Sequence, residues 1–182
     1  MADLSLRALC QEDIPHVVNY WFNKTDAELF QAGVDKNKMG TREAWAEMLE
    51  NILHTPLENA HSWYLIWQIN NQPIGYSTLR NISKNNLADI HLHIWESSTR
   101  GKGYGARLFA MSVVEFYKLF NFKLMLCEPN AQNPSPNKVL RKIGFQKWRS
   151  MLGAPVSICL SYEMNSYIID LDTALNYLSK SK

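Results

Sequence analysis

The sequence lacks the features that mark membrane proteins and most nucleic-acid-binding proteins. No segment reaches the run of about 18 uninterrupted apolar residues that a transmembrane helix needs, so we expect no membrane span. The net charge is only +2 over 182 residues, which is too weak a positive field to predict binding to nucleic acid. We therefore expect neither a membrane nor a nucleic acid as a partner.

Cysteine is also scarce, with only Cys10, Cys127 and Cys159 in the chain. Their number is odd and their spacing is wide, and no Cys-x-x-Cys pair or Cys/His zinc spacing occurs. Cys127 and Cys159 lie in apolar runs, which favours buried free thiols in a reducing compartment. We expect a cytoplasmic protein that has no metal site.

The chain does have enough apolar material for one ordinary domain. Hydrophobic residues make up 46% of it and aromatic residues 12%, which is sufficient for a real core and argues against disorder. No internal repeat, linker or low-complexity segment divides the chain. We therefore expect a single domain over residues 1–182.

The first half predicts an alternation of strands and helices. Alternating apolar residues predict a strand at 4–8, and Asp13 is the expected N-cap of a first helix. Residues 23–40 are polar and irregular, and Thr41 is the expected N-cap of a second helix. Aromatic and branched residues then predict three strands, at 63–69, 74–79 and 87–95.

The second half continues the pattern. Ser135 followed by Pro136 is typical of a helix start, and Gly144 is the expected C-terminal stop of that helix. The remaining expected elements are a helix from about Tyr104, a buried strand at 122–127, strands at 145–151 and 156–164, and an amphipathic helix at about 170–179. This order predicts an α/β domain with a mixed sheet.

A glycine-rich segment, Arg100-Gly101-Lys102-Gly103-Tyr104-Gly105, lies between an expected strand and an expected helix. Glycines let the backbone turn sharply and approach a ligand, and the first N–H groups of a helix carry partial positive charge without internal partners. The segment is therefore suited to bind an anion such as a pyrophosphate. Its spacing matches neither a dinucleotide fingerprint nor a P-loop. The alternative is a tight turn that needs glycines beside a solvated Arg/Lys pair.

The strand before that loop carries an unusual face. Period-two alternation places Asp89, His91, His93 and Trp95 on one side of it. Histidine has a suitable pKa for a general base at neutral pH, so His91 and His93 are the candidate catalytic residues, with His91 preferred. Two other interpretations stay open: packing or hydrogen-bonding histidines on a partly wet face, and a zinc site, for which no third ligand is evident.

Two segments together resemble the acyltransferases of the GNAT superfamily. The loop fits that family's pattern of Arg or Gln, two residues, Gly, one residue, then Gly or Ala. Downstream, Asn133 followed by Leu140 and Lys142-Ile143-Gly144-Phe145 is similar to a second family segment. The resemblance covers roughly residues 4–164. It implies one GNAT-like α/β domain with a mixed, mostly antiparallel sheet, splayed at its centre and flanked by helices, plus an extra C-terminal helix.

The resemblance also implies a binding site for acetyl-CoA as co-substrate. Backbone N–H groups from Lys102 to Ala106 would hold its pyrophosphate, Ile94 and Trp95 would pair with the pantetheine arm, and Asn133 would contact the chain from the other side. The full set of implied cofactor-binding residues is Ile94, Trp95, Arg100, Gly101, Lys102, Gly103, Tyr104, Gly105, Ala106 and Asn133.

The implied activity is transfer of an acetyl or short acyl group to a primary amine of a small molecule or protein N-terminus. Many family members carry a tyrosine where this chain has Leu140, a departure similar to the branch acting on ribosomal-protein N-termini and to siderophore-type enzymes. The alternative is a non-catalytic acyl-CoA-binding or regulatory domain. Acidic residues within 23–40 are suited to attract a cationic amine, or form an ordinary solvated loop. The last helix is compatible with its own core or with a homodimer.

Overall fold

The computed structural model describes residues 2–82, 87–120, 122, 124–154 and 157–180. A seven-stranded sheet runs through it in the order β1-β2-β3-β4-β5-β7-β6. All neighbouring strands are antiparallel except β4 and β5, which are parallel. The strands are β1 (Leu4–Ala8), β2 (Ser62–Ile69), β3 (Gln72–Arg80), β4 (Leu87–Ile94), β5 (Leu124–Cys127), β6 (Gln146–Gly153) and β7 (Tyr162–Ile169).

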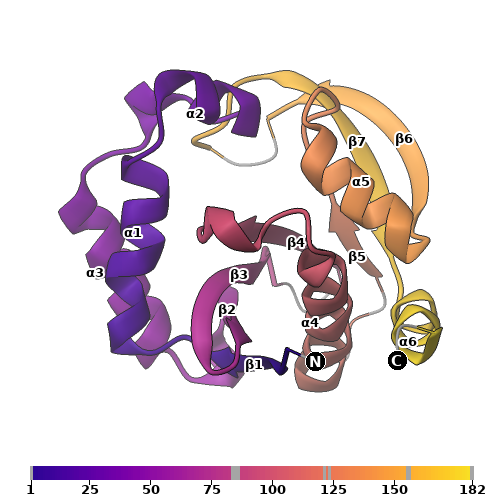
Figure 1. Ribbon diagram of the computed structural model, residues 1–182. Coiled ribbons are helices and arrows are strands. Elements are labelled where there is room, and N and C mark those ends of the chain that lie inside the picture. The colour runs from indigo at the N-terminus through magenta and orange to yellow at the C-terminus, as the bar shows by residue number, and fades with distance from the viewer. Residues whose placement is uncertain (1, 83–86, 121, 123, 155–156, 181–182) are drawn as a thin grey trace.

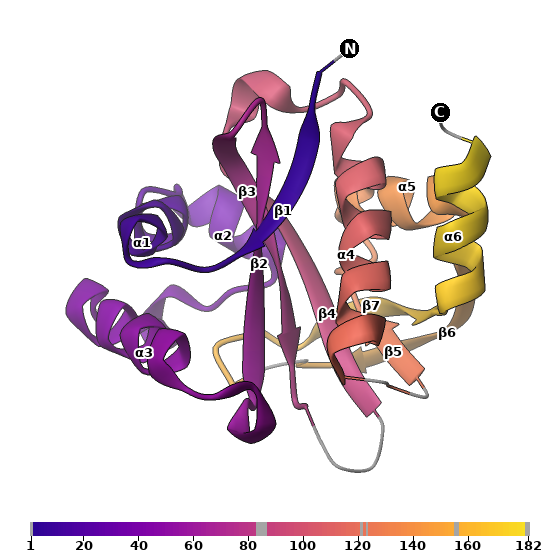
Figure 2. The same ribbon diagram turned by 90° about the horizontal axis from the view of Figure 1, so that it is seen from below.

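Helices cover both faces of the sheet. One face carries the three N-terminal helices, and the other carries α4 with α6 alongside it (Figures 1 and 2). No helix in the described part of the chain is long and apolar enough to cross a membrane. The helices are α1 (Ile14–Phe22), α2 (Asp26–Ala32), α3 (Arg42–His54), α4 (Tyr104–Phe120), α5 (Pro134–Ile143) and α6 (Leu171–Lys180).

The sheet opens at its centre, between β4 and β5. These strands pair only from Leu87 to Asp89 on β4, against Leu124 to Leu126 on β5. Beyond those pairs β4 stays with β3 while β5 turns toward β7. The splayed, mostly antiparallel sheet expected from the sequence is therefore confirmed, and the gap opens toward the start of α4.

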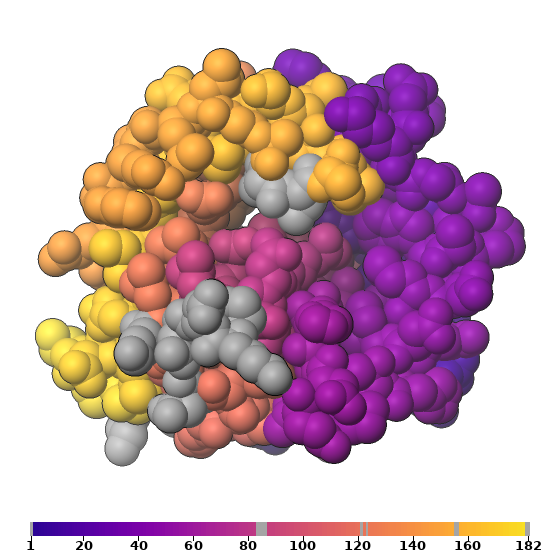
Figure 3. Space-filling view, turned by 180° about the vertical axis from the view of Figure 1, so that it is seen from behind, coloured from indigo at the N-terminus to yellow at the C-terminus, as the bar shows by residue number. Residues whose placement is uncertain are grey.

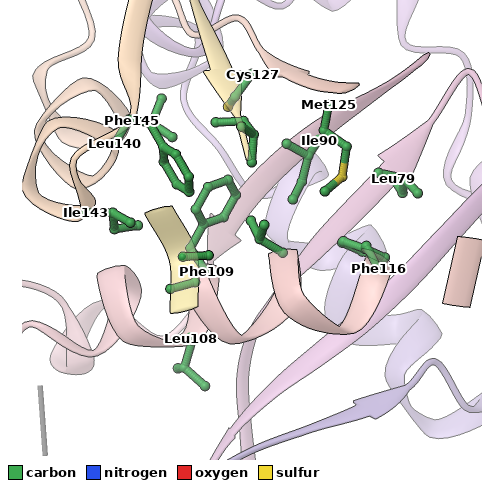
Figure 4. Close-up of a cluster of buried hydrophobic side chains, with 14 of the residues drawn as sticks. Leu79, Ile90, Leu108, Phe109, Phe116, Met125, Cys127, Leu140, Ile143 and Phe145 are labelled. Atoms are coloured by element: carbon green, nitrogen blue, oxygen red, sulfur yellow. The ribbon is translucent and has the colours of Figure 1, made fainter. Parts of the chain in front are cut away.

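The larger core fills the space between the sheet and α4. Phe109 and Phe116 project from α4 onto Ile90 of β4 and Met125 of β5, all fully buried (Figure 4). Burial of apolar surface at about 25 cal/mol per Å² holds this helix on the sheet. Because α4 is fixed along its length, its first turn is held rigidly beside the gap.

A second core holds α1 and α3 against the opposite face. Trp21 of α1 and Trp45 of α3 are buried there beside Tyr76 of β3. Each tryptophan N–H has a partner, since Trp21 donates to the Tyr76 hydroxyl at 2.7 Å and Trp45 donates to the Met39 carbonyl at 2.6 Å. This face therefore presents a firm aromatic wall opposite α4.

The last helix packs into the protein's own core. Ala174 of α6 is fully buried, and the Tyr117 hydroxyl of α4 donates to the Ile169 carbonyl, just before α6, at 2.9 Å. Leu175, on the outer side, remains 45% exposed. The apolar stripe of α6 is thus used within the chain, on the same side as α4.

One expected helix start is confirmed in position and another is wrong. Asp13 occupies the N-cap position of α1, but its side chain makes no capping hydrogen bond; its carboxylate instead receives hydrogen bonds from Arg7 and from the Cys10 N–H. Helix α5 begins at Pro134 with Asn133 as N-cap, instead of at Ser135, because the Asn133 side chain accepts the Ser135 N–H at 3.3 Å. Capping preferences alone allow a side-chain cap from Asp13 and a helix start at Ser135. The hydrogen bonds that Asp13 and Asn133 make in the structure exclude both.

The segments at 23–40 and 156–164 also differ from expectation. Residues 26–32 form α2, capped by Thr25, within the region expected to be irregular. The final strand occupies Tyr162–Ile169, so the sheet extends beyond the expected core boundary at 164. Its expected start at 156 lies outside the described residues, while Val34 pairs with Cys159 and Asp35 N–H donates to the Ile158 carbonyl at 2.8 Å. Part of the apolar segment expected as a strand at 156–164 is therefore a connection whose backbone pairs with the residues that follow α2.

Candidate active site

The glycine-rich loop joins a 3-10 turn at Ser97–Thr99 to the first residue of α4. Gly101 and Gly103 have φ angles of +77° and +85°, in the left-handed region that L side chains avoid. The turn therefore needs glycine at both positions for conformational reasons. It brings the unpaired N–H groups at the start of a 17-residue helix to the surface.

The three glycines of the loop serve different purposes. A Cβ at Gly101 would meet nothing within 4 Å, and one at Gly103 would meet only the Lys142 Nζ at 3.5 Å, so both border open space. A Cβ at Gly105 would lie 3.2 Å from Cδ1 of Ile94. Gly105 is therefore explained by close packing of α4 on β4, whereas Gly101 and Gly103 leave room for a ligand.

Positive side chains surround this open space. Arg100 and Lys102 are exposed. The Arg100 guanidinium also donates to the Ile94 carbonyl at 2.7 Å, which ties the loop to the end of β4. The Lys142 ammonium, from α5, approaches Gly103 from the other side. Lys142 was not expected as a site residue, although the Lys-x-Gly-Phe segment that contains it was recognised.

The end of β4 offers its backbone to the gap through alternate residues. Trp95 N–H donates to the Ile74 carbonyl of β3 at 3.0 Å, so that N–H is not available for a ligand in the gap. Alternation along the strand then turns the N–H and carbonyl groups of Leu92 and Ile94 toward the gap. The Trp95 ring stacks on His16 of α1 at 5.5 Å between centroids. The Trp95 side chain therefore lies on the face of the sheet that carries α1, and not in the gap.

Asn133, Tyr104 and Ala106 have structural roles that fix the loop's surroundings. Tyr104 starts α4 and packs partly buried against the core, and Ala106 is buried beneath it. Asn133 is half-buried at the N-terminus of α5, and its backbone carbonyl accepts from the buried Asn137 side chain at 2.8 Å. Asn133 therefore lies at the start of a second helix, α5.

The predicted face of β4 is present, and it looks toward α1, α2 and α3. Asp89, His91 and His93 pair in register with Arg80, Thr78 and Tyr76 of β3. His93 is enclosed by aromatic rings: its centroid lies 4.8 Å from that of Tyr76 and 5.0 Å from that of Trp21. Burial, together with the charge of neighbouring groups, holds the pKa of His93 well below its ordinary value. This environment favours the packing interpretation for His93.

His91 differs from His93 because its Nε2 is buried and has no hydrogen-bond partner among the described residues. The residue as a whole is half-buried. Burial, and then the positive charge of Arg80, lower the pKa of His91 to about 3. The imidazole is therefore neutral at physiological pH and holds a proton poorly, which disfavours it as the general base.

Two carboxylates beside the histidines were not expected as site residues. Burial raises the pKa of Asp89, a hydrogen bond from Asn81 opposes the rise, and the charge of Glu128 adds to it. Glu128 follows directly after β5 and accepts a hydrogen bond from the Ser166 hydroxyl. Asp89 is the last residue of β4 paired with β5, so this acidic pair lies where the gap begins. The period-two pattern that contains His91 also contains Asp89 and was the available signal.

The model of the acetyltransferase (GNAT) domain family matches residues 3–146 of this chain. The chain belongs to the GNAT acetyltransferase family. It is therefore an enzyme that uses acetyl-CoA as co-substrate and transfers the acetyl group to an amine, and nothing in the comparisons supports a non-catalytic domain. No curated protein matches the sequence.

Solved GNAT structures have the same fold at low sequence identity. A spermidine N-acetyltransferase from Vibrio cholerae, in complex with CoA and spermine, is 16% identical over 95% of this chain and 98% of its own, with a TM-score of 0.75. RimL, a ribosomal L7/L12 alpha-N-protein acetyltransferase in complex with CoA, is 16% identical over 93% and 95%, with a TM-score of 0.74. A dodecameric structure of the Vibrio cholerae enzyme is 16% identical over 98% of both chains, with a TM-score of 0.70.

Three further expectations can be compared with this GNAT structure. Leu140, in the position where many relatives have tyrosine, is fully buried in the core and offers no proton donor. No group of three His, Cys, Asp or Glu side chains within the described ranges is arranged to hold a metal ion. Cys127 and Cys159 are buried, as expected, and Cys10 is half-buried; none of the three forms a disulfide in the described part of the chain.

The acidic residues of the 23–40 region are already engaged within the chain. Asp26 forms an exposed ion pair with Lys36 at 2.7 Å. Glu28 accepts the backbone N–H of Thr25 at 2.8 Å as part of a capping box. Asp35 accepts the Asn37 N–H at 3.0 Å. These local contacts do not support the hypothesis that the acidic residues of this region attract a cationic amine.

Proposed function

We propose that this enzyme acetylates a primary amine by direct attack on acetyl-CoA lying in the gap between β4 and β5. The observation that carries this proposal is the gap itself, which opens beyond Asp89 and leads to the glycine loop at the start of α4. One end of that gap is suited to a diphosphate, and the other end has ionisable side chains. Acetyl-CoA bound along the gap would place its diphosphate at the glycine loop and its thioester near the ionisable side chains.

The residues proposed to bind acetyl-CoA lie on three elements. Backbone N–H groups from Lys102 to Ala106 hold the pyrophosphate at the helix start, where the partial positive charge favours an anion. The side chains of Arg100, Lys102 and Lys142 add full positive charge around Gly103. The outward backbone groups of Leu92 and the outward N–H of Ile94 pair with the pantetheine arm, and Asn133 at the start of α5 faces it.

The proposed reaction passes the proton of the amine to a carboxylate. An alkylamine has a pKa near 10.4, so at neutral pH nearly all of it is protonated and cannot attack. Asp89, with its raised pKa, accepts this proton directly or through water, and the unpaired Nε2 of neutral His91 orients the amine. The free amine forms a bond to the acetyl carbon, the carbon–sulfur bond breaks, and the proton that the attacking nitrogen then loses passes through water to the CoA thiolate.

The acceptor class and the assembly are further parts of this proposal. The substrates of the similar solved enzymes, spermidine and the α-amino group of a ribosomal protein, support a primary amine in general. The dodecameric neighbour supports self-association of this chain, with the homodimer as its smallest form. The three cysteines, which form no disulfide among the described residues, support a reducing, cytoplasmic location.

Release of CoA thiol tests the function. Acetyl-CoA is offered with a panel of amines, amino acids and peptides, and thiol is measured over time. We expect at least one amine to accelerate release while acetyl-CoA also stabilises the fold against heat. If acetyl-CoA binds and no amine accelerates thiol release, the chain is an acyl-CoA-binding domain and the proposed enzyme function is wrong.

Variants at Asp89 and His91 test the proton chemistry. We expect Asp89→Asn to reduce kcat by about 100-fold or more, because the proton acceptor is lost. Wild-type activity should fall as pH drops through the raised pKa of Asp89. His91→Ala should reduce activity by a constant factor between pH 6 and 9, since its pKa of about 3 keeps the imidazole neutral there. A His91→Ala loss that changes steeply near pH 6.5 would instead make His91 the base.

A further inference from the structure

A polar recess opens on the α3 side of the sheet, next to the acidic end of the gap. Its volume is about 650 Å³, and it lies between the end of β3 and the connection from β6 to β7. Figure 3 views the molecule from behind, where the surface is hollowed between the orange and purple segments. Lys38, His61, Arg80 and Asn81 contribute to its lining, and no described lining residue is acidic.

Arg80 is the unusual member of this lining. Arg80 is half-buried, and among the described residues its guanidinium makes one long hydrogen bond, 3.5 Å to the Tyr64 hydroxyl. It forms no ion pair with any carboxylate in the part of the chain that the structure describes, even though Asp89 lies opposite it in register. Asp89 instead accepts from Asn81 at 2.5 Å. A partly buried guanidinium with five donors and so few partners is poised to receive an anion.

The recess adjoins the groups proposed to act on the amine. Asn81 both lines the recess and hydrogen-bonds Asp89, the last β4 residue before the gap. His91, two residues further along the same face, is close enough to Arg80 to be affected by its charge, and its Nε2 is buried without a partner. Negative and positive groups therefore follow one another from the gap into the recess.

We propose that the acceptor is a small amine that also carries a carboxylate, which Arg80 binds while the amine end meets Asp89 and His91. This inference rests on the proposed function and specifies its substrate class. A flat guanidinium fits a carboxylate through two parallel hydrogen bonds.

The charge balance of the recess favours a single negative charge on the acceptor. Lys38, at the rim, is already 3.7 Å from Asp35 and donates to the Cys159 carbonyl at 3.4 Å. Arg80 is therefore the principal uncompensated charge, which matches a monoanionic carboxylate better than a doubly charged phosphate. A polyamine, which carries only positive charge, would be repelled.

Matched acceptors test the inference on the wild-type enzyme. Thiol release is measured with β-alanine against β-alaninamide, γ-aminobutyrate against its amide, phosphoethanolamine against ethanolamine, and spermidine. We expect each carboxylate to exceed its amide by about tenfold or more in kcat/KM. Equal rates for acid and amide, or preference for spermidine or phosphoethanolamine, would overturn the inference while leaving the enzyme function intact. Absence of turnover with every amine would overturn both.

Substitution of Arg80 provides the second arm. We expect Arg80→Gln to raise KM for the best carboxylate acceptor by about ten- to a hundredfold and to leave that for its amide unchanged. Arg80→Lys should recover part of the loss. Arg149→Gln is the matched control, because Arg149 lies on β6 and stacks on Trp148 at 4.3 Å. An unchanged dissociation constant for acetyl-CoA shows that each variant is folded, and an unchanged acid-to-amide ratio in Arg80→Gln would contradict the assignment.

Discussion

Asp89, His91 and His93 alternate along one face of β4, yet their surroundings give each a different chemistry. His93 is held among aromatic rings, His91 keeps one unpaired nitrogen, and Asp89 has a raised pKa beside Glu128. The alternation of these residues is readable from the sequence, because period two follows from strand geometry. Their pKa values depend on burial and on charges from other strands, which the sequence does not reveal.

The glycine loop can be tested at the level of one residue. Gly103→Val places a β-branched side chain at φ +85° and shifts the backbone whose N–H groups are proposed to bind pyrophosphate. We expect the dissociation constant for acetyl-CoA, measured by calorimetry, to rise by at least about tenfold, which is about 1.4 kcal/mol.

Gly40→Val is the control for that substitution. Gly40 has a similar φ of +73°, and a Cβ there meets nothing within 4 Å, so the backbone strain is matched at a position away from the loop. Its affinity for acetyl-CoA should equal that of the wild type. Equal weakening in both variants would trace the effect to general destabilisation and would contradict the role of Gly103.

At the scale of elements, local signals predicted the existence of helices better than their starts. Thr41 caps α3 as expected, since its hydroxyl accepts the Ala44 N–H at 3.2 Å. Asp13 resembles a cap equally well in the sequence, but its carboxylate is committed to Arg7 of β1. The short helix α2 went unpredicted because seven residues carry little periodicity. Its position is fixed by pairing with residues near 159, more than 120 positions away.

The Arg7–Asp13 pair joins β1 to the first helix, and its strength should depend on pH. Asp13 is 1% exposed; burial alone would raise its pKa, but hydrogen bonds from Arg7 and Cys10 outweigh this and lower the pKa. The pair therefore stabilises the fold above the unfolded pKa of about 3.9 and loses this effect as pH falls through the folded value.

We expect Asp13→Asn to lower the free energy of unfolding at pH 7 by about 2–4 kcal/mol, measured with urea. The difference from wild type should shrink below about pH 4. Asp26→Asn, which breaks the exposed pair with Lys36, should cost less than about 1 kcal/mol and serves as control. A pH-independent deficit in Asp13→Asn would mean that shape, and not charge, explains the cost.

For the whole molecule, the feature that creates the proposed acetyl-CoA site is the separation of β4 from β5. Helices packed on the sheet keep the two strands apart. Helix α4 fixes one wall through Phe109 and Phe116, and α6 supports α4 from outside. The last helix was compatible with a dimer interface as judged from sequence. Its apolar face is occupied within the chain, which leaves only its outer side for a second copy.

Two substitutions on α6 separate these roles. Ala174→Glu buries a charge at a position with no exposure and should lower the free energy of unfolding by about 3 kcal/mol or more. Leu175→Glu, at a position 45% exposed, should change stability by less than about 0.5 kcal/mol and leave the molar mass by light scattering unchanged. A halved mass in Leu175→Glu would place a dimer interface on the outer side of α6.

The sequence by itself determined the features that depend on near neighbours. These are the order of most strands and helices, the glycine-rich loop before α4 and the positive charges beside it, because backbone conformation and helix ends follow from residues a few positions apart. Only the tertiary structure decided which side chains meet. It brought Arg80 beside His91 and Glu128 beside Asp89, and it engaged the acids of the 23–40 region in local bonds. Electrostatic interactions depend on distance and burial, and both are set by contacts between strands far apart in the chain.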